Sequence, residues 1–233
     1  MKSWILIAAL ISVTTACAIR SNLDTPFVDP KNKPVDNSTK YCKPDANGNY
    51  DGQTVLADGD LGPDNIAWAE GGGCVLRPIR EVWAALQNIE LSRWDETASA
   101  TYTRVDHPNK DFTHLYTVTY SRGSPIGPIT WTIAWYYGFD RGTFDAPERI
   151  NITYQKVSGS SMIPVWEGSV TLTHVKDGVT SFGMHTNFQA FQGNPQNVQA
   201  AKDSIRDIMS KARTVAPNWI NLNTGFHTDP SIP

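Results

Sequence analysis

Several residues of this 233-residue chain have side chains that can act as nucleophiles or metal ligands, and their spacing shows which chemistry is available. Residues 123–127, Gly-Ser-Pro-Ile-Gly, place Ser124 one position too early for the Gly-x-Ser-x-Gly turn that exposes a hydrolase nucleophile. The five histidines are dispersed, and neither a His-Glu-x-x-His nor a Cys-x-x-Cys pattern occurs. Serine hydrolysis and a structural zinc site are therefore disfavoured, and we assign no catalytic residue and no metal ligand.

Two histidines and three acidic residues remain open to two interpretations. His114 and His185 fall on predicted strands and titrate near neutral pH, so either could serve as a polar group or general base inside a cavity. Alternatively, both face solvent from the surface of a sheet. Asp106, Asp111 and Glu167 are either catalytic carboxylates or solvated acids at the edges of turns.

Residues 45–52, Asp-Ala-Asn-Gly-Asn-Tyr-Asp-Gly, carry oxygen ligands at alternating positions, as a calcium-binding loop does. The EF-hand pattern is incomplete, because Tyr50 occupies the position of its glycine and Leu56 the position of its bidentate glutamate. The segment therefore either binds calcium through other oxygens or forms a turn. We predict no cofactor.

The amino terminus predicts export. Lys2 precedes an uncharged, mostly apolar run over residues 3–16, which is shorter than the roughly 20 residues a helix needs to span a bilayer. Residues 1–18 are therefore interpreted as a signal peptide. The end of the run fits the ordinary signal-peptidase site, and residues 13–17 also resemble a bacterial lipobox in which Cys17 becomes lipidated. We expect the protein either in the bacterial envelope, facing the periplasm and held to a membrane by a lipid on Cys17, or secreted.

Cysteine usage agrees with an oxidising compartment. Once Cys17 is lipidated or removed, Cys42 and Cys74 remain as an even pair, and we expect a disulfide between them. Cys42 lies in residues 19–65, which are rich in Pro, Asn, Asp and Gly and show no sustained apolar period. We interpret this segment as a polar spacer that the disulfide fixes to the folded body.

Composition indicates a folded domain with no general affinity for polyanions. Aromatic residues make up 10% of the chain and include eight Trp, which excludes disorder throughout. The formal net charge of −3 provides no basic field for holding nucleic acid, so we predict no nucleic-acid partner.

The periodicity of apolar residues predicts an α+β domain. A first strand is expected over residues 67–77, and Pro78 then begins a helix with Val82, Trp83 and Leu86 at helical spacing. A second short helix is predicted over residues 89–95. A period of two then indicates six antiparallel strands, over residues 100–105, 112–120, 129–137, 150–157, 165–174 and 179–190. A long amphipathic helix begins near residue 194 and ends before Pro217.

Residues 77–86, Arg-Pro-Ile-Arg-Glu-Val-Trp-Ala-Ala-Leu, resemble the Ala-Pro-x-x-x-Val-Trp-x-x-Leu opening of the START-like superfamily, also called SRPBCC or helix-grip. Arg77 replaces the usual small residue before the proline. The order of elements over residues 66–216 adds to the resemblance and leaves residues 217–233 as a tail. The resemblance implies a curved antiparallel sheet of about seven strands wrapped around a long C-terminal helix, with one or two short helices after the first strand.

The resemblance also implies a binding cavity between the sheet and the C-terminal helix. The residue pattern independently predicts the same cavity. A sheet with many inward aromatic side chains and only one long helix to cover it can leave an apolar hollow. Ordinary core packing is the alternative for each residue. Our candidates for lining the cavity are Tyr116, Trp131, Trp135, Tyr154, Met184, Phe188, Ile205 and Met209.

Three functions follow from this sequence. The first is an exported domain that binds a hydrophobic small molecule or lipid without covalent chemistry, for carriage or sequestration. The second is an enzyme similar to the polyketide cyclases and aromatases of the superfamily, which needs a buried acid–base group. The third is an envelope scaffold or interaction lipoprotein, whose interior is filled by its own side chains and whose surface exposes an apolar patch.

Overall fold

A computed structural model of the chain describes residues 40–62, 65–87, 99–109, 112–125, 127–143, 146–191 and 193–214. The predicted signal peptide, the short helix over residues 89–95 and the tail lie outside these residues. The elements are β1 (Leu56–Leu61), β2 (Ala67–Val75), α1 (Ile79–Leu86), β3 (Ser99–Asn109), β4 (Phe112–Arg122), β5 (Ile129–Gly142), β6 (Pro147–Gly159), β7 (Val165–Lys176), β8 (Val179–Gln189) and α2 (Asn194–Thr214).

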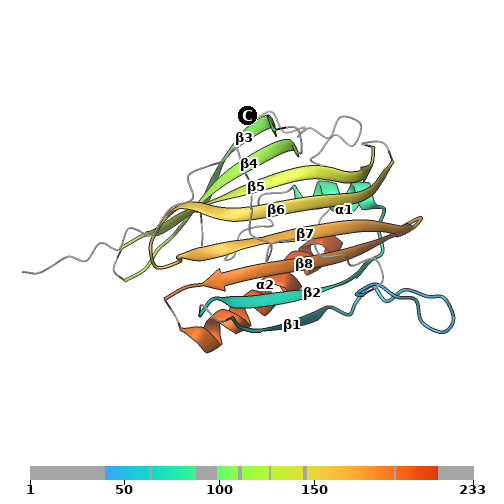
Figure 1. The fold of residues 1–233 in the computed structure, drawn as a ribbon, viewed down its shortest axis with the longest axis horizontal. Coiled ribbons are helices and arrows are strands. Elements are labelled where there is room, and N and C mark those ends of the chain that lie inside the picture. The colour runs from blue at the N-terminus through green and yellow to red at the C-terminus, as the bar shows by residue number, and fades with distance from the viewer. Residues whose placement is uncertain are drawn as a thin grey trace, which may run out of the picture.

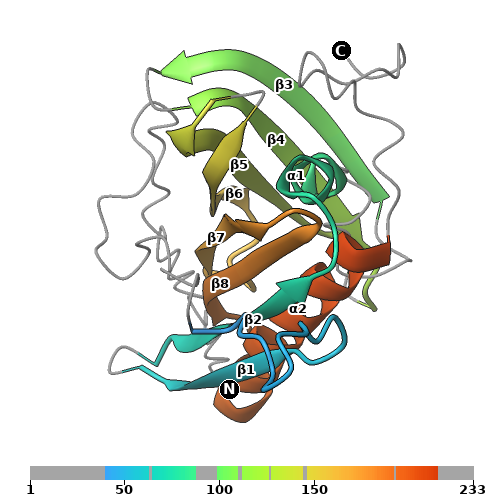
Figure 2. The ribbon, with the colours of Figure 1, turned by 90° about the vertical axis from the view of Figure 1, so that its right-hand side faces the viewer.

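The strands form one antiparallel sheet of eight strands in the order β1-β2-β8-β7-β6-β5-β4-β3 (Figure 1). Strands β3 to β8 are paired in sequence order, and the last strand, β8, then pairs with β2. Both helices lie on the same side of this curved sheet (Figure 2). The predicted helix-grip architecture is confirmed, with one more strand than expected.

The additional strand is β1, which falls within the segment interpreted as a spacer. It pairs with β2 along its whole length, from Leu56 opposite Gly72 to Leu61 opposite Ala67. Its inward positions are only half-buried, and Asp58 and Asp60 are exposed. A short edge strand of this composition has too weak an apolar alternation to be predicted, so its pairing with β2 decides its structure.

Strand β2 continues through its three consecutive glycines because it is paired on both sides, with β1 and with β8. Glycine is required at one of these positions by close packing. A β-carbon added to Gly73 would lie 2.7 Å from Cε of Met209 on α2 and 2.6 Å from the Thr54 carbonyl oxygen. The missing side chain therefore allows α2 to pack directly on β2.

A disulfide joins Cys42 to Cys74, as predicted, with 4.7 Å between the two Cα atoms. The segment that precedes β1 is held to the body by further contacts. Glu70 of β2 accepts hydrogen bonds from Lys40 and Tyr41. From the last turn of α2, the Arg213 guanidinium donates to the carbonyl oxygens of Gln53, Thr54 and Cys74. This part of the predicted spacer is thus attached to both β2 and α2.

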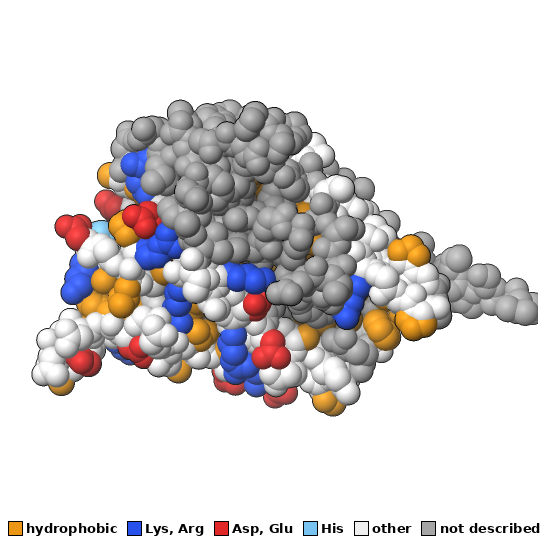
Figure 3. All heavy atoms as spheres, turned by 180° about the vertical axis from the view of Figure 1, so that it is seen from behind, with side chains coloured by type: hydrophobic (Ala, Val, Ile, Leu, Met, Phe, Trp, Pro, Cys, Tyr) orange, Lys and Arg blue, Asp and Glu red, His pale blue; other side chains and the backbone are white. Residues whose placement is uncertain are grey.

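The surface of the described residues is electrically mixed. Basic and acidic side chains are interspersed over the described part of the face shown in Figure 3. Within the described ranges, neither helix has the length and apolar character needed to cross a membrane.

Candidate functional site

The centre of the inner sheet face is a row of cross-strand neighbours. Tyr116 on β4 lies opposite Trp135 on β5, which lies opposite Tyr154 on β6. All three side chains are buried, and the rings of Trp135 and Tyr154 stack with their centroids 4.5 Å apart. Alternation within each strand directs these side chains inward, because the same strands place Ile133 and Ile152 in the core.

The row continues on β7 with a glycine that makes room for Tyr154. A β-carbon added to Gly168 would lie 2.6 Å from the Tyr154 hydroxyl oxygen. The phenol therefore extends over β7, where no side chain stands in its way. Beyond Gly168 the row contains only the small residues Thr186 on β8 and Ala69 on β2.

A second aromatic group links β4 to β8. Trp131 stacks on Tyr120 at 5.5 Å between centroids and lies 6.3 Å from Trp166, which in turn meets Phe188 edge-to-face at 5.7 Å. Trp166 was not among the predicted site residues. The alternation of β7, in which Val170 faces the core, contained the signal that could have identified it.

The eight predicted lining residues all belong to one buried cluster, and the structure divides them into two groups. The aromatic group lies on β4 to β6, whereas Met184, Phe188, Ile205 and Met209 lie on β8 and α2. Helix α2 packs chiefly against β1, β2 and β8. The stacked aromatic side chains therefore lie beyond the part of the sheet on which α2 chiefly packs. Whether the eight residues contact a ligand stays a prediction.

The end of α1 lies over the inner face of β5, where the Tyr137 hydroxyl donates to the Leu86 carbonyl oxygen at 3.3 Å. The next residue, Gln87, caps the helix and is 0% exposed. It lies on the same helical side as Trp83, four residues earlier, which is part of the core. Sequence reasoning missed Gln87, because a polar residue at a helix end normally points into solvent.

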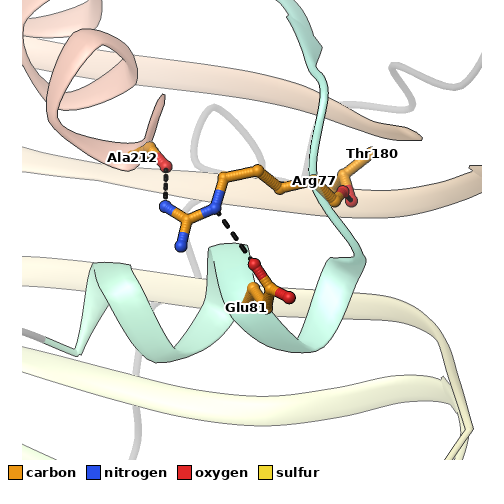
Figure 4. Close-up of polar contacts among 4 residues, drawn as sticks. All are labelled: Arg77, Glu81, Thr180 and Ala212. Carbon is orange, nitrogen blue, oxygen red and sulfur yellow. Dashed lines mark hydrogen bonds and ion pairs between the residues drawn. The ribbon is translucent and has the colours of Figure 1, made fainter. Parts of the chain in front are cut away.

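Arg77, the residue that departs from the family pattern, connects the two helices (Figure 4). Its guanidinium donates to Glu81 on α1 at 3.2 Å and to the Ala212 carbonyl oxygen near the end of α2 at 3.3 Å. Its own carbonyl oxygen accepts a hydrogen bond from Thr180 on β8 at 2.8 Å. A small residue at this position could not bridge α1 to the last turn of α2.

The fully buried part of the inner face carries neutral side chains, and the half-buried Lys156, paired with the core residue Ile133, adds a cation beside it. Burial raises the pKa of Tyr154 and of Tyr137, so both phenols remain protonated at physiological pH. Within the described part of the chain, the fully buried residues include no Asp, Glu, His, Lys or Arg.

Two of the residues considered for acid–base chemistry, His185 and Glu167, point away from this face. His185 is paired with Glu70 on β2 and lies between the inward residues Met184 and Thr186, so it points to the opposite side of the sheet. The interpretation of His185 as a group inside a cavity is therefore wrong. Glu167 alternates in the same way with Trp166 and faces away from the site. The side chains of His114 and Asp106 lie outside the described part of the structure, as does Asp111.

The other two sequence motifs form turns. The Ser124 hydroxyl donates to the Gly127 carbonyl oxygen at 2.5 Å, closing the turn between β4 and β5. In the acidic loop, the Asp45 carboxylate accepts hydrogen bonds from the backbone N–H groups of Asn47 and Asn49, both at 2.8 Å. The described residues contain no group of three or more His, Cys, Asp or Glu side chains positioned to hold a metal ion.

Comparisons with known proteins identify the fold. Neither the protein-family models nor the curated proteins match this sequence. The structure is similar to human StAR-related lipid transfer protein 5, with a TM-score of 0.50 and 12% identity, covering 77% of this chain and 88% of that chain. It also matches the lipid transfer and protein localization domain of human StarD13 (DLC2), with a TM-score of 0.48 and 12% identity, covering 70% and 86% of the two chains. The Zhui aromatase/cyclase from Streptomyces sp. R1128 matches with a TM-score of 0.38 and 12% identity, covering 68% of this chain and 94% of that chain. The chain has the START-like, helix-grip fold that its sequence resembles.

Proposed function

We propose that this protein binds a hydrophobic small molecule or lipid between the inner face of its sheet and α2, and that it carries or sequesters that molecule. The proposal rests on one observation: α2 covers one part of the inner sheet face, and the stacked aromatic side chains lie on another part. Helix α2 packs chiefly on β1, β2 and β8, whereas the stacked aromatic side chains lie on β4 to β6. The fold is shared with human StAR-related lipid transfer protein 5, whose name states lipid transfer, and this likeness supports the proposal.

The energetics favour an apolar ligand. Removing apolar ligand surface from water contributes about 25 cal/mol per Å². The aromatic rings are held in place by stacking on one another, as between Trp135 and Tyr154. Little side-chain entropy is then lost when a ligand binds, which leaves more of the burial free energy as affinity.

Export is part of the proposal. We infer that residues 1–18 direct the chain out of the cytoplasm and that Cys17 carries a lipid anchor, which would hold the domain at a membrane. The disulfide between Cys42 and Cys74 supports this inference, because such bonds persist in oxidising compartments.

The two alternative functions have less support. A cyclase-like enzyme needs a buried acid–base group, and the buried residues of the described part include tyrosines but no Asp, Glu, His, Lys or Arg. A scaffold needs an exposed apolar patch, but the large apolar side chains exposed in the described part are spread along the chain: Leu56 in β1, Leu76 after β2, Val105 in β3 and Phe191 after β8.

Native mass spectrometry of the protein purified without denaturation tests the proposal. We expect a hydrophobic adduct that is released under denaturing conditions and identified by organic extraction. A Trp135→Gln variant should lose the adduct, while the matched surface variant Phe191→Gln, at a position that is 67% exposed, should keep it. A protein that is empty when purified, and remains empty when mixed with extracted membrane lipids, would overturn the proposal in favour of the scaffold function.

A further inference from the structure

Three side chains at the inner face have polar atoms that are buried without a hydrogen-bond partner in the described part of the structure. They are the amide nitrogen and oxygen of Gln87, the indole nitrogen of Trp135 and the hydroxyl oxygen of Tyr154. The exposed fractions of these residues are 0%, 7% and 0%. Buried polar groups are normally paired, and an unpaired one carries an unrecovered desolvation cost. A ligand atom that pairs with these groups would recover that cost.

The three residues lie on neighbouring elements, β5, β6 and the end of α1. Trp135 and Tyr154 are stacked neighbours on β5 and β6. Gln87 approaches from α1, directly after Leu86, whose carbonyl oxygen is bound by Tyr137. Tyr137 shares the inward side of β5 with Trp135, two residues away. The unpaired atoms therefore belong to side chains on β5, on β6 and at the end of α1, which a hydrogen bond joins to β5.

The chemistry of these groups selects the polar part of the ligand. An indole N–H can only donate, whereas an amide and a phenol can both donate and accept. Together they suit an uncharged oxygen, either a hydroxyl or a carbonyl. A charged group would find no opposite charge among the fully buried described residues, and an unpaired buried charge is strongly disfavoured. Two cations lie nearby, Arg80 on α1, with two buried guanidinium nitrogens, and the half-buried Lys156 opposite Ile133, and each has an interaction of its own.

We infer that the bound molecule is a neutral apolar compound with one hydroxyl or carbonyl oxygen, and that this oxygen is held by the indole N–H of Trp135 together with Gln87 and Tyr154. The inference rests on the proposed function and narrows it to neutral alcohols and ketones. Ionised fatty acids and lipids that bury a charged headgroup are excluded from this position.

Binding measurements with matched probes test the inference. The full chain, freed of co-purifying ligand, is titrated at pH 8 with 1-dodecanol, 2-dodecanone, dodecanoate and dodecane, followed by tryptophan fluorescence and calorimetry. We expect the alcohol and the ketone to bind at least about tenfold more tightly than dodecanoate, because only they place an uncharged oxygen near the unpaired donors.

Three variants separate hydrogen bonding from packing. Trp135→Phe keeps a ring on Tyr154 but removes the N–H, and Gln87→Met keeps the length of the side chain but removes the amide. Each should weaken binding of the alcohol and the ketone about tenfold and leave dodecane binding unchanged. Trp68→Phe is the matched control, because Trp68 lies between the inward residues Ala67 and Ala69 on β2 and so faces the opposite side of the sheet.

The outcomes distinguish the inference from the proposed function. If dodecanoate binds as tightly as the alcohol, or if both test variants behave like Trp68→Phe, the inference is wrong while the proposed function stands. If the Trp135 variant fails to fold, the effect of Gln87→Met on binding of the alcohol and the ketone tests the inference. If none of the probes binds, the proposed function is overturned and the inference with it.

Discussion

The disulfide between Cys42 and Cys74 should contribute several kcal/mol to the free energy of unfolding. The bridged residues are 32 apart in the sequence. Closing a loop of that length lowers the entropy of the unfolded chain by about 12 cal/mol/K, which corresponds to about 3.7 kcal/mol at 25 °C. Both side chains are buried beside Val179, so replacing them with alanine also removes some packing. We expect the Cys42→Ala/Cys74→Ala variant to be less stable by about 3–5 kcal/mol.

Equilibrium unfolding in urea measures this loss. With a slope of about 2 kcal/mol/M, the midpoint should fall by roughly 2 M. A reducing agent should lower the midpoint of the natural chain by a similar amount and leave that of the double variant unchanged, which is the internal control. Amide hydrogen exchange should increase mainly in residues 40–55, the segment that the disulfide and the contacts of Arg213 hold to the body.

A small effect would refute this reasoning. If the double variant and the reduced natural chain both unfold within about 1 kcal/mol of the oxidised protein, the disulfide does not restrict the unfolded chain as the loop-entropy argument requires. The hydrogen bonds of Arg213 and Glu70 would then be sufficient to hold the segment.

Three further predictions concern the attachment of the helices and of the amino terminus. Burial raises the pKa of Glu70, but hydrogen bonds from Lys40 and a neighbouring tyrosine outweigh it, so the folded pKa lies below the unfolded value. This contact stabilises the fold above about pH 4.5 and is lost as the pH falls through the folded pKa, so Glu70→Gln should lose less stability on acidification than the natural chain; equal acid titration curves, followed by fluorescence, would contradict this. Arg77→Met removes the hydrogen bond to the Ala212 carbonyl oxygen and should cost about 1–2 kcal/mol, with faster amide exchange in the last turn of α2; unchanged exchange there would show that the bond does not hold the helix end. If Cys17 is lipidated, the protein should fractionate with membranes and incorporate a palmitate analogue, and Cys17→Ser should abolish both; a natural chain that is soluble and unlabelled would indicate simple secretion.

Much of the fold could be predicted from local periodicity. In β5, alternation assigned Trp131 and Trp135 to the inner face, and both are buried there. The start of α2 near Asn194 and the pairing of Cys42 with Cys74 were also predictable, because an amphipathic period and an even number of exported cysteines are local or countable features.

The sequence by itself thus determined the order of elements, the inward faces of the strands and the aromatic character of the interior, because these depend on the side-chain period of a strand or helix. Only the tertiary structure decided which residues meet across strands. Gly168 makes room for Tyr154, and Arg77 bridges two helices whose contacting residues are far apart in the chain. Gln87 is buried because the end of α1 packs on β5, and no local pattern distinguishes it from a solvated residue at a helix end.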